Sequence, residues 1–452
     1  MPNQGGTVLE EHDPPETGPR SGATGEIGAA DQSEPMPQIQ SSGFDRRGFL
    51  RGAALATAVA GAGVAACSTS SKPTSGAAQN VSAATAATGQ AEPSAPAAAS
   101  GETTARGWAV HDTSGNLAPV SFARRALRPD DIRVDIKYAG VCHSDIHFGH
   151  ADWGTPPYPL VPGHEIAGIV AEVGSAVTRF KPGDQIAVGT VVDSCGHCAE
   201  CVSGNEVYCL NGYTHTYGAK SQDPGGYTQG GYSNSIVVRE HYAFQVPRGL
   251  ELAQAAPIVC SGITVYSPMR AWGVREGWRV GVVGIGGLGH FAVQTAKKLG
   301  AEVVAFTTSP GKADDAKRFG ASTVVVNEDK RQMDGLGKSF DFILDTVPYA
   351  HNLEPYFPLL KRRRVFCRVG LGKLSTPNEW GQLSIFSNQL VVTGSNTGGI
   401  RETQEAIDFC AANKIGPQTQ VVPADQISEV WKKVFDKQAR YRYVIDAATI
   451  TG

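Results

Sequence analysis

The sequence predicts an α/β protein in which a β-rich lobe is joined to a doubly wound parallel sheet. Residues 106–259 are β-rich and punctuated by Gly and Pro, whereas residues 260–394 alternate apolar strands with helical segments. The second pattern is typical of the βαβ units from which doubly wound sheets are built. The folded part of the chain is then roughly 350 residues long, which is enough for two domains.

The front of the chain differs in composition from the rest. Residues 1–42 are rich in Gly, Pro, Glu and Gln and offer little to bury, so we expect disorder there. The pair Arg46-Arg47 precedes an alanine-rich run, Gly52 to Ala66, and this order predicts a twin-arginine export signal. The run is too short and too weakly apolar to span a bilayer as a stable helix. Residues 1–67 therefore form the predicted N-region and signal.

The signal ends in Val-Ala-Ala-Cys67, which resembles a lipobox, the sequence after which a cysteine is lipidated. The alternative is an ordinary signal cleaved nearby, with Cys67 incidental. Residues 68–105 are rich in Ala, Ser, Thr and Pro and are expected to form a flexible linker. These features predict an exported, membrane-anchored lipoprotein of the cell envelope. If the signal interpretation is wrong, the protein is cytoplasmic.

Four cysteines with metal-type spacing lie within the first lobe. Cys195, Cys198, Cys201 and Cys209 follow the pattern C-x2-C-x2-C-x7-C. Thiolates at this density can wrap one tetrahedral zinc ion in a closed, structural site. The alternative is a set of disulfides or unused thiols. His197 lies inside the run but is interpreted as a bystander, because four thiolates already satisfy the ion.

A second set of ligand types is spread along the chain. Cys142, the pair His164-Glu165 and Cys260 suggest an open zinc site with two cysteines, one histidine and a free fourth position. Sites of that kind are catalytic, whereas closed four-cysteine sites are structural. The sequence therefore predicts two zinc ions per chain with different tasks.

The residues after Cys142 carry groups suited to proton transfer. An apolar-patterned segment, Ile132 to Val141, is followed by Cys-His-Ser144-Asp145-Ile-His147. Ser144 can accept the proton of a zinc-bound alcohol and His147 can relay it towards water. Asp145 is suited to hold His164 as an outer carboxylate. The alternative for His147 is a solvated surface histidine, and His143 and His150 are given no role.

A glycine-rich loop opens the second lobe. A buried strand, Arg279 to Val283, precedes Gly-Ile-Gly-Gly-Leu-Gly at residues 284–289, and a helical segment, His290 to Leu299, follows. In that setting the loop predicts a dinucleotide site with the pyrophosphate on the helix N-terminus. The next strand, Glu302 to Phe306, is followed by hydroxyls and a lysine where an NAD binder places an acidic residue.

Thr307, Thr308, Ser309 and Lys312 therefore favour the 2′-phosphate of NADP(H). The alternative is that Lys312 is simply a solvated helix residue. Because pyridine nucleotides are found inside the cell, an exported enzyme would have to retain its cofactor or act before export.

From about residue 106 the chain resembles the zinc-dependent medium-chain alcohol dehydrogenases, and most closely their cinnamyl-alcohol-dehydrogenase branch. The branch includes bacterial NADP-dependent aldehyde reductases. The matching stretches are Gly140 to His147, Tyr158 to Glu165, the four-cysteine cluster, Cys260 to Ser267, the glycine loop, Gly394 to Gly399 and Tyr441 to Ile445. The resemblance implies a GroES-like catalytic domain at 106–259, a Rossmann domain at 260–394 and a tail, 395–452, that returns to the catalytic domain.

The resemblance also implies roles for individual residues. Cys142, His164 and Cys260 match the catalytic zinc ligands, and Glu165 matches a glutamate that can approach or replace the metal's water. Ser144 and His147 match the proton relay, and Trp153 matches an aromatic wall of the substrate pocket. The residues expected to bind the cofactor are Ser144, Thr264, Gly284, Ile285, Gly286, Gly287, Leu288, Gly289, Thr307, Thr308, Ser309, Lys312, Thr346, Gly370, Ser395, Asn396 and Thr397. Plant members favour a bulky aromatic where this chain has Asn396, which argues against a phenylpropanoid preference.

The expected reaction is reversible hydride transfer between NADPH and an aldehyde, giving a primary alcohol. The alternatives are a polyol or secondary-alcohol dehydrogenase on the same scaffold, and an exported, non-catalytic zinc- or nucleotide-binding protein. We expect a small-molecule substrate and a homodimer. The formal net charge of −3 argues against nucleic-acid binding, and the basic run Lys361 to Arg364 is expected to be a solvated loop before a strand at Val365 to Val369.

Overall fold

The computed structural model describes residues 101–326, 330–376, 378 and 380–451. The predicted disordered region, the export signal and Cys67 lie outside the described residues. The first strand, β1 (Thr103–Val110), begins inside the range predicted as linker and pairs antiparallel with β2 (Leu117–Arg124). Within the described ranges, no helix combines the length and the apolarity needed to cross a bilayer.

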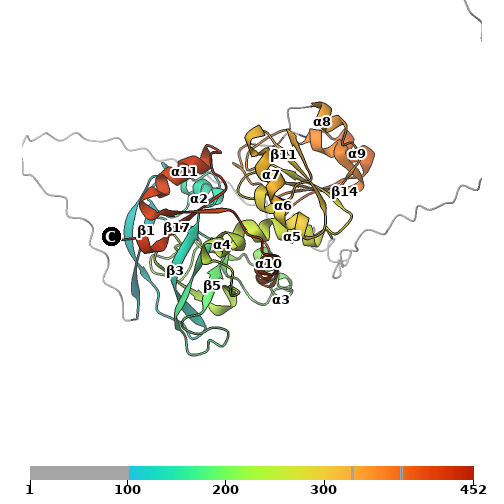
Figure 1. Ribbon diagram of the computed structural model, residues 1–452. Helices are drawn as coiled ribbons and strands as arrows, with labels where there is room; N and C mark the ends of the chain where they lie inside the picture. Colours follow the sequence, from blue (N-terminus) through green and yellow to red (C-terminus); the bar gives the residue numbers. More distant parts are fainter. Residues whose placement is uncertain (1–100, 327–329, 377, 379, 452) are drawn as a thin grey trace, which may run out of the picture. The chain divides into compact units, whose positions relative to one another are not determined.

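The first lobe is built around a seven-stranded sheet. Its strand order is β16-β17-β3-β4-β5-β9, and β8 also pairs with β3. The bounds are β3 (Asp131–Gly140), β4 (Ile166–Val173), β5 (Gln185–Val188), β8 (Ser235–Arg239), β9 (Ala243–Gln245), β16 (Thr419–Pro423) and β17 (Arg442–Asp446). The short strands β6 (Val191–Asp193) and β7 (Thr214–His215) form a separate pair. In Figure 1 the red C-terminal strand β17 lies beside the blue-green strand β3, so the tail completes the first lobe.

The second lobe is a six-stranded sheet in which every neighbouring pair is parallel. Its order is β12 (Thr323–Val326), β11 (Glu302–Thr307), β10 (Arg279–Val283), β13 (Phe340–Asp345), β14 (Leu360–Arg368) and β15 (Val391–Gly394). This order, 3-2-1-4-5-6 within the lobe, is that of a dinucleotide-binding doubly wound sheet. The predicted fold class is confirmed.

The parallel sheet is covered on both faces, because its strands are apolar on both sides. Val280 and Val282 of β10 pack in the core that includes Phe291 of α6, whereas the neighbouring Val283 packs in a core with Phe357. All six residues of β13 are buried. Alternate residues of one strand therefore serve two cores, as the period of a strand requires.

Helices connect and cover the sheets (Figure 1). The α-helices are α2 (His143–Gly149), α3 (Ala199–Val202), α4 (Leu252–Pro257), α5 (Ile263–Ala271), α6 (Gly289–Lys298), α7 (Ala313–Phe319), α8 (Lys330–Asp334), α9 (Leu383–Asn388), α10 (Ile400–Asn413) and α11 (Ile427–Phe435). Between α4 and α5 the chain forms a π-helical turn, η3 (Ile258–Gly262). The 3-10 turns are η1 (Glu206–Tyr208), η2 (Glu240–Tyr242), η4 (Pro310–Lys312), η5 (Glu354–Leu359), η6 (Ala424–Gln426) and η7 (Ala447–Thr449).

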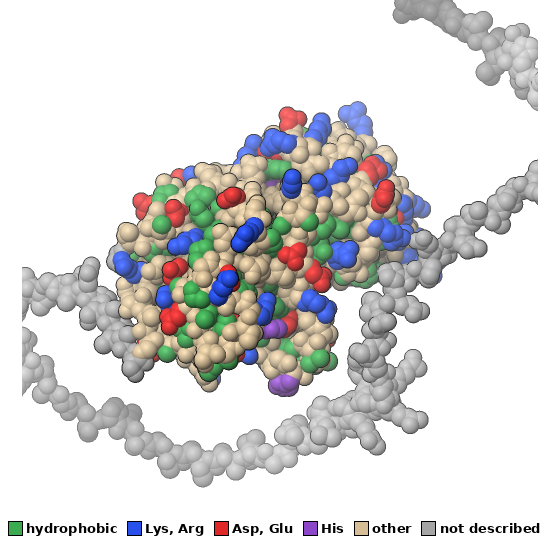
Figure 2. All heavy atoms as spheres, turned by 60° about the horizontal axis from the view of Figure 1, so that its bottom comes forward, with side chains coloured by type: hydrophobic (Ala, Val, Ile, Leu, Met, Phe, Trp, Pro, Cys, Tyr) green, Lys and Arg blue, Asp and Glu red, His purple; other side chains and the backbone are tan. Residues whose placement is uncertain are grey.

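The basic run at residues 361–364 is not a loop, contrary to the prediction. It lies inside β14, where a register shift against β13 accommodates it. Lys361 and Arg364 form ion pairs with Asp341, which is buried in β13, at 2.9 and 3.3 Å. A buried carboxylate needs opposite charge nearby, so these two basic residues stabilise the pairing of β14 with β13 by compensating the charge of Asp341. Figure 2 shows charges of both signs on the visible surface, with many Lys and Arg side chains over the parallel-sheet lobe.

Candidate active site

The four cysteines of the predicted structural site come together in the loop around α3. The Sγ atoms of Cys195 and Cys201 are 3.8 Å apart, those of Cys198 and Cys201 3.5 Å, and those of Cys198 and Cys209 3.9 Å. Tetrahedral zinc with bonds of about 2.3 Å to sulfur places its ligands about 3.8 Å apart, so the set fits zinc. The disulfide alternative is wrong, because these cysteines are free and the separations are far longer than a sulfur–sulfur bond.

The second ligand set is gathered from three separate segments. Cys142 is the N-cap of α2, His164 and Glu165 directly precede β4, and Cys260 lies in the π-helical turn. The Sγ atoms of Cys142 and Cys260 are 3.9 Å apart, and His164 Nε2 is 3.2 Å from Cys260 Sγ. One ligand atom from each of the four residues lies within 4.8 Å of the others, and all four residues are buried. This soft, compact donor set fits a zinc ion with a position left for a substrate.

Asp145 organises the segments that carry these ligands. It is fully buried, and its carboxylate accepts hydrogen bonds from the backbone N of Cys142 (2.9 Å), the backbone N of Gly163 (3.2 Å) and the hydroxyl of Tyr232 (2.9 Å). His164 Nδ1 lies 3.1 Å from Asp145 Oδ1. A carboxylate at Nδ1 leaves Nε2 as the atom that faces a metal. The structure thus brings Asp145 and His164 together as the sequence interpretation required.

Glu165 is paired with a residue that sequence reasoning did not find. Its carboxylate forms a buried ion pair with Arg442 of β17, which lies 277 positions later. Burial raises the pKa of Glu165 to about 7, although Arg442 opposes the shift. The second carboxylate oxygen, Oε2, is buried and has no hydrogen-bond partner among the described residues. Nothing local in the sequence signals this pair, because it depends on the return of β17 beside β3.

The predicted proton relay lies next to the second ligand set. Ser144 Oγ is 3.6 Å from Cys142 Sγ, and His147 Nδ1 is 2.8 Å from Asp152 Oδ2. His147 is 2% exposed, so the solvated-histidine alternative is wrong. Because a carboxylate only accepts, Nδ1 carries the proton and Nε2 is left as an acceptor. His147 Nε2 is buried and has no partner within the described part of the chain.

A single cavity of ≈1240 Å³ joins the second ligand set to the glycine loop. That volume exceeds the range of about 300–1,000 Å³ usual for small-ligand pockets, which suits a dinucleotide together with a small substrate. Of the residues predicted for the catalytic and cofactor sites, His147, Glu165 and Gly289 are not part of its lining. The predicted residues that do line it are Cys142, Ser144, Trp153, His164, Cys260, Thr264, Gly284, Ile285, Gly286, Gly287, Leu288, Thr307, Thr308, Ser309, Lys312, Thr346, Gly370, Ser395, Asn396 and Thr397.

Close backbone contacts shape the nucleotide end of the cavity. Gly289 opens α6, and a Cβ there would lie 1.7 Å from the carbonyl oxygen of Gly284, so only glycine fits. The Thr346 hydroxyl donates to the carbonyl oxygens of Val283 and Gly284, each at 2.9 Å. The loop is thereby held open at the end of β10, where a pyrophosphate can approach the backbone.

The end of β11 carries hydroxyls and a lysine, as predicted. Thr307 Oγ1 accepts a hydrogen bond from the backbone N of Ser309 at 3.1 Å. Lys312 is partly buried, lines the cavity and lies over the ring of Tyr441 at 5.8 Å, so it is not simply solvated. Burial lowers the pKa of Lys312, with the nearby Arg440 adding to the effect. This environment suits an anionic group better than a free ribose hydroxyl.

Several other residues that line the cavity were missed from the sequence. His143 was given no role, yet its Nε2 is buried without a partner among the described residues, and burial lowers its pKa to about 4. Thr190, Tyr213 and His215 also line the cavity, from the neighbourhood of β6 and β7. Trp153, which was predicted, donates from Nε1 to the carbonyl oxygen of Gly372 at 2.9 Å. His143 lies in α2 and His215 in the short strand β7, while the other two lie directly before β6 and β7, so their approach to the cavity is set by the tertiary fold.

Comparison with known proteins finds a domain-family match for each of the two lobes. Residues 128–248 match the alcohol dehydrogenase GroES-like domain, and residues 287–412 match the zinc-binding dehydrogenase domain. NADP-dependent alcohol dehydrogenase C 1 of Mycolicibacterium smegmatis is 44% identical over 348 residues, which cover 77% of this chain and 99% of the relative. Aldehyde reductase YahK of Escherichia coli is 45% identical over 337 residues, or 74% of this chain and 96% of the relative. The crystal structure of CAD from Helicobacter pylori complexed with NADP(H) matches with a TM-score of 0.72 and 36% identity, covering 77% of this chain and 99% of that one.

Proposed function

Since the chain belongs to the medium-chain zinc-dependent alcohol dehydrogenase family, we propose that it is an NADP(H)-dependent alcohol dehydrogenase and aldehyde reductase. It transfers hydride reversibly between NADPH and an aldehyde, giving a primary alcohol. The observation that carries this proposal is that one cavity holds both the open ligand set and the glycine loop. The same combination argues against a non-catalytic binding protein, which has no use for Ser144 and His147 beside an open metal position.

Cys142, His164 and Cys260 would hold the catalytic zinc, and the four-cysteine loop would hold the structural one. When bound, zinc supplies a Lewis acid for the carbonyl oxygen and NADPH supplies the hydride. The backbone of the glycine loop would take up the pyrophosphate, and the end of β11 the 2′-phosphate.

The chain's own contribution to chemistry is positioning and proton transfer. Ser144 Oγ, beside Cys142, donates a proton to the product alkoxide. His147 takes up a proton from water at Nε2 and passes it on to Ser144, while Asp152 accepts the hydrogen bond from Nδ1 and holds the ring in place. Trp153 stacks on His147 with ring centroids 5.0 Å apart, so the proposed wall of the substrate pocket also packs against the imidazole of the proton relay.

A substrate panel tests the function. The purified, zinc-loaded protein would be assayed for NADPH oxidation with aldehydes beside ketones, and for NADP⁺ reduction with polyols. We expect the highest kcat/KM with aldehydes. A preference for ketones or polyols would replace this activity with a secondary-alcohol or polyol dehydrogenase, and no turnover with any substrate would overturn the enzyme assignment.

We also propose a homodimer formed through the parallel-sheet lobe. Trp380, Leu383 and Phe386 are 54, 75 and 84% exposed, and α9 packs on β14 beside the edge strand β15. Large exposed apolar side chains beside a sheet edge favour pairing with a second copy. Light scattering should give twice the chain mass, and Phe386→Glu should give a monomer. A wild-type monomer would contradict the proposal.

The proposed address and domain limits rest on the sequence. The protein is exported by the twin-arginine pathway, lipidated at Cys67 and held on the outer face of the membrane by a tether. Arg46→Lys with Arg47→Lys should keep active protein inside the cell, and Cys67→Ala should remove the acyl label and release protein from the membrane fraction. Wild-type protein found only in the cytosol with an intact N-terminus would contradict this address. The domain limits 106–259, 260–394 and 395–452 also stay predictions.

A further inference from the structure

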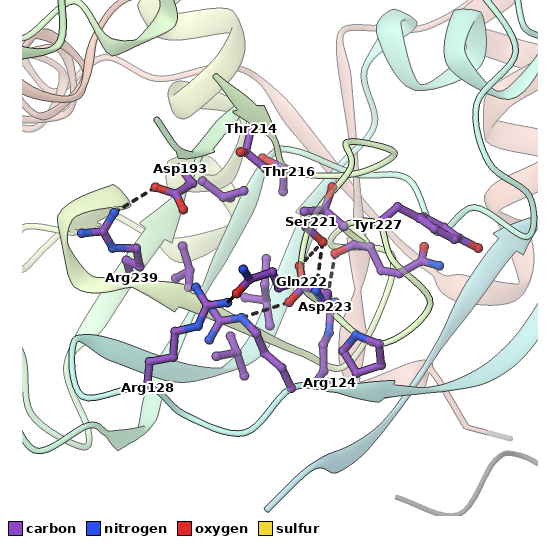
Figure 3. Close-up of a pocket in the computed structure, with 18 of the residues that line it drawn as sticks. Arg124, Arg128, Asp193, Thr214, Thr216, Ser221, Gln222, Asp223, Tyr227 and Arg239 are labelled. Carbon is purple, nitrogen blue, oxygen red and sulfur yellow. Dashed lines mark hydrogen bonds and ion pairs between the residues drawn. The ribbon is translucent and has the colours of Figure 1, made fainter. Parts of the chain in front are cut away.

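The first lobe has a second cavity, of ≈450 Å³, that shares no lining residue with the catalytic one (Figure 3). It is formed by the end of β2 and the segment that follows it, by β8, and by the chain between β7 and residue 229. Thr214 and Thr216 line this cavity, whereas Tyr213 and His215 line the catalytic one. Alternate residues of one extended segment therefore form the wall between two separate cavities.

The lining of the second cavity is polar and carries more positive than negative charge. It contains five cationic side chains and two carboxylates, Asp193 and Asp223. Both carboxylates are already engaged, because Asp193 pairs with Arg239 at 2.9 Å and Asp223 pairs with Arg125 at 2.9 Å. The excess positive charge is therefore not neutralised by the lining itself.

The excess charge lies on Arg124, Arg128 and Lys220. None of them forms an ion pair with a carboxylate among the described residues. Figure 3 shows Arg124 and Arg128 on the side of the cavity opposite Thr214 and Thr216. The guanidinium of Arg128 donates to the neutral Gln222 Oε1, at 3.1 Å, and Lys220 is exposed.

Arg124 is a buried cation, 7% exposed, whose hydrogen-bond partners are all neutral oxygens. Its guanidinium donates to the carbonyl oxygens of Ser235 (2.9 Å), Gln229 (2.6 Å) and Gly230 (2.9 Å), and to Ser233 Oγ (2.9 Å). Burial lowers the pKa of Arg124 to about 9, with Asp223 opposing the shift. A desolvated guanidinium without a paired anion makes this wall of the cavity favourable for negative charge.

We propose that this cavity binds a small polar molecule through an oxyanion group, a phosphate or a carboxylate. Arg128 and Lys220 contact the oxyanion, and Arg124 supplies fixed positive charge behind it. Guanidinium and ammonium groups form strong, charge-assisted hydrogen bonds with such oxygens. The Thr214 hydroxyl and the Gln222 amide are placed to bind the polar remainder of the ligand. The volume lies within the range of about 300–1,000 Å³ found for small-molecule sites.

Calorimetry on the zinc-loaded full chain tests the proposal. Saturating NADP⁺ would be present throughout, so that phosphate probes do not report on the nucleotide site. The probes are glycerol 3-phosphate, glycerate and uncharged glycerol, which separate a phosphate from a carboxylate preference. We expect saturable one-site binding of at least one anionic probe and no binding of glycerol. No saturable binding of either anion would overturn the proposal.

Paired variants locate the site. Arg128→Gln with Lys220→Gln should weaken anion binding at least tenfold, while aldehyde turnover and zinc content stay at wild-type values. The control is Lys181→Gln with Arg248→Gln, which removes the same charge from exposed positions of the same lobe outside the cavity. The control should bind the probe like the wild type. Unchanged binding in the first variant, or equal loss in both, would place the anion elsewhere and refute the site.

Discussion

Removing one thiolate from the four-cysteine loop tests how that part of the molecule is held together. In the wild type, Cys198 Sγ lies 3.5 Å from Cys201 Sγ and 3.9 Å from Cys209 Sγ. Cys198→Ala removes this sulfur and leaves the cluster with three thiolates. We expect the structural ion to leave and residues 195–209 to lose their order. The catalytic ligand set shares no residue with this cluster and should keep its own ion.

The magnitude follows from what else could hold the loop. Val202 and Leu210 are 74 and 70% exposed, and Val207 is the one fully apolar side chain other than cysteine that the segment 195–209 buries. Burying one valine contributes about 1.5–3 kcal/mol. A structural zinc site contributes on the order of 10 kcal/mol of apparent binding energy at neutral pH, so the metal dominates. Glu206, which bonds His241 Nε2 (3.1 Å) and the backbone N of Ile400 (2.9 Å), should keep only the end of the loop anchored.

The assay is elemental analysis combined with amide hydrogen exchange. Zinc content should fall from two ions to one per chain, and exchange should accelerate in residues 195–209 but not in the buried strand β13. His197→Ala is the matched control, because His197 lies in the same loop, is exposed and is not a member of the ligand set. The reasoning is refuted if Cys198→Ala keeps both ions, or if its loop exchanges as slowly as in the control.

The remaining predictions concern the catalytic cavity. Cys142→Ala should abolish turnover and lower zinc from two ions to one, with a melting temperature near that of the wild type; two retained ions would contradict its place in the ligand set. His147→Asn should lower kcat about 10²-fold or more while both ions remain, because general-base relays contribute about 10²–10⁴-fold; steady-state kinetics with unchanged kcat would remove His147 from the relay. Thr307→Asp should reverse the preference for NADPH in kcat/KM. The backbone N of Ser309, which donates to Thr307 Oγ1 at 3.1 Å in the wild type, can hold the new carboxylate, and this carboxylate repels a 2′-phosphate. Equal kcat/KM of the wild type with NADPH and NADH would contradict the assignment. Because burial lowers the pKa of Lys312, its positive charge is present below that depressed pKa and is lost as pH rises through it. The KM for NADPH, but not that for NADH, should therefore rise at a lower pH than an ordinary lysine would give, and Lys312→Arg should suppress this rise. Parallel pH profiles of KM for the two cofactors would contradict this role of Lys312.

Local patterns in the sequence were sufficient for the elements whose structure depends on near neighbours. The strand predicted at 279–283 is β10, and the predicted helix after the glycine loop is α6, displaced by one residue at each end. The four-cysteine cluster spans only residues 195–209, so its spacing already determines which thiols can meet. The resemblance to a family added the pairing of Cys142 and His164 with the distant Cys260, which spacing alone did not supply.

Other features depended on contacts between segments far apart in the chain. The Arg442–Glu165 pair requires β17 to return beside β3, and α2, which carries the buried His147, packs on the distant helix α11. The basic run at 361–364 looked like a loop because its partner Asp341 lies on a different strand.

By itself, the sequence determined the chemistry that the chain can offer: two sets of zinc-type ligands, a loop for a dinucleotide, and hydroxyls with a lysine in place of an acidic residue. These features can be recognised in the sequence because they depend on residue type and on short spacings along the chain. Tertiary structure decided which polar groups are buried, which charges are paired, and that Tyr213 and His215 face one cavity while Thr214 and Thr216 face another. Burial and ion pairing of this kind arise when distant segments of the chain pack together and exclude water, and local sequence patterns do not predict which segments will meet.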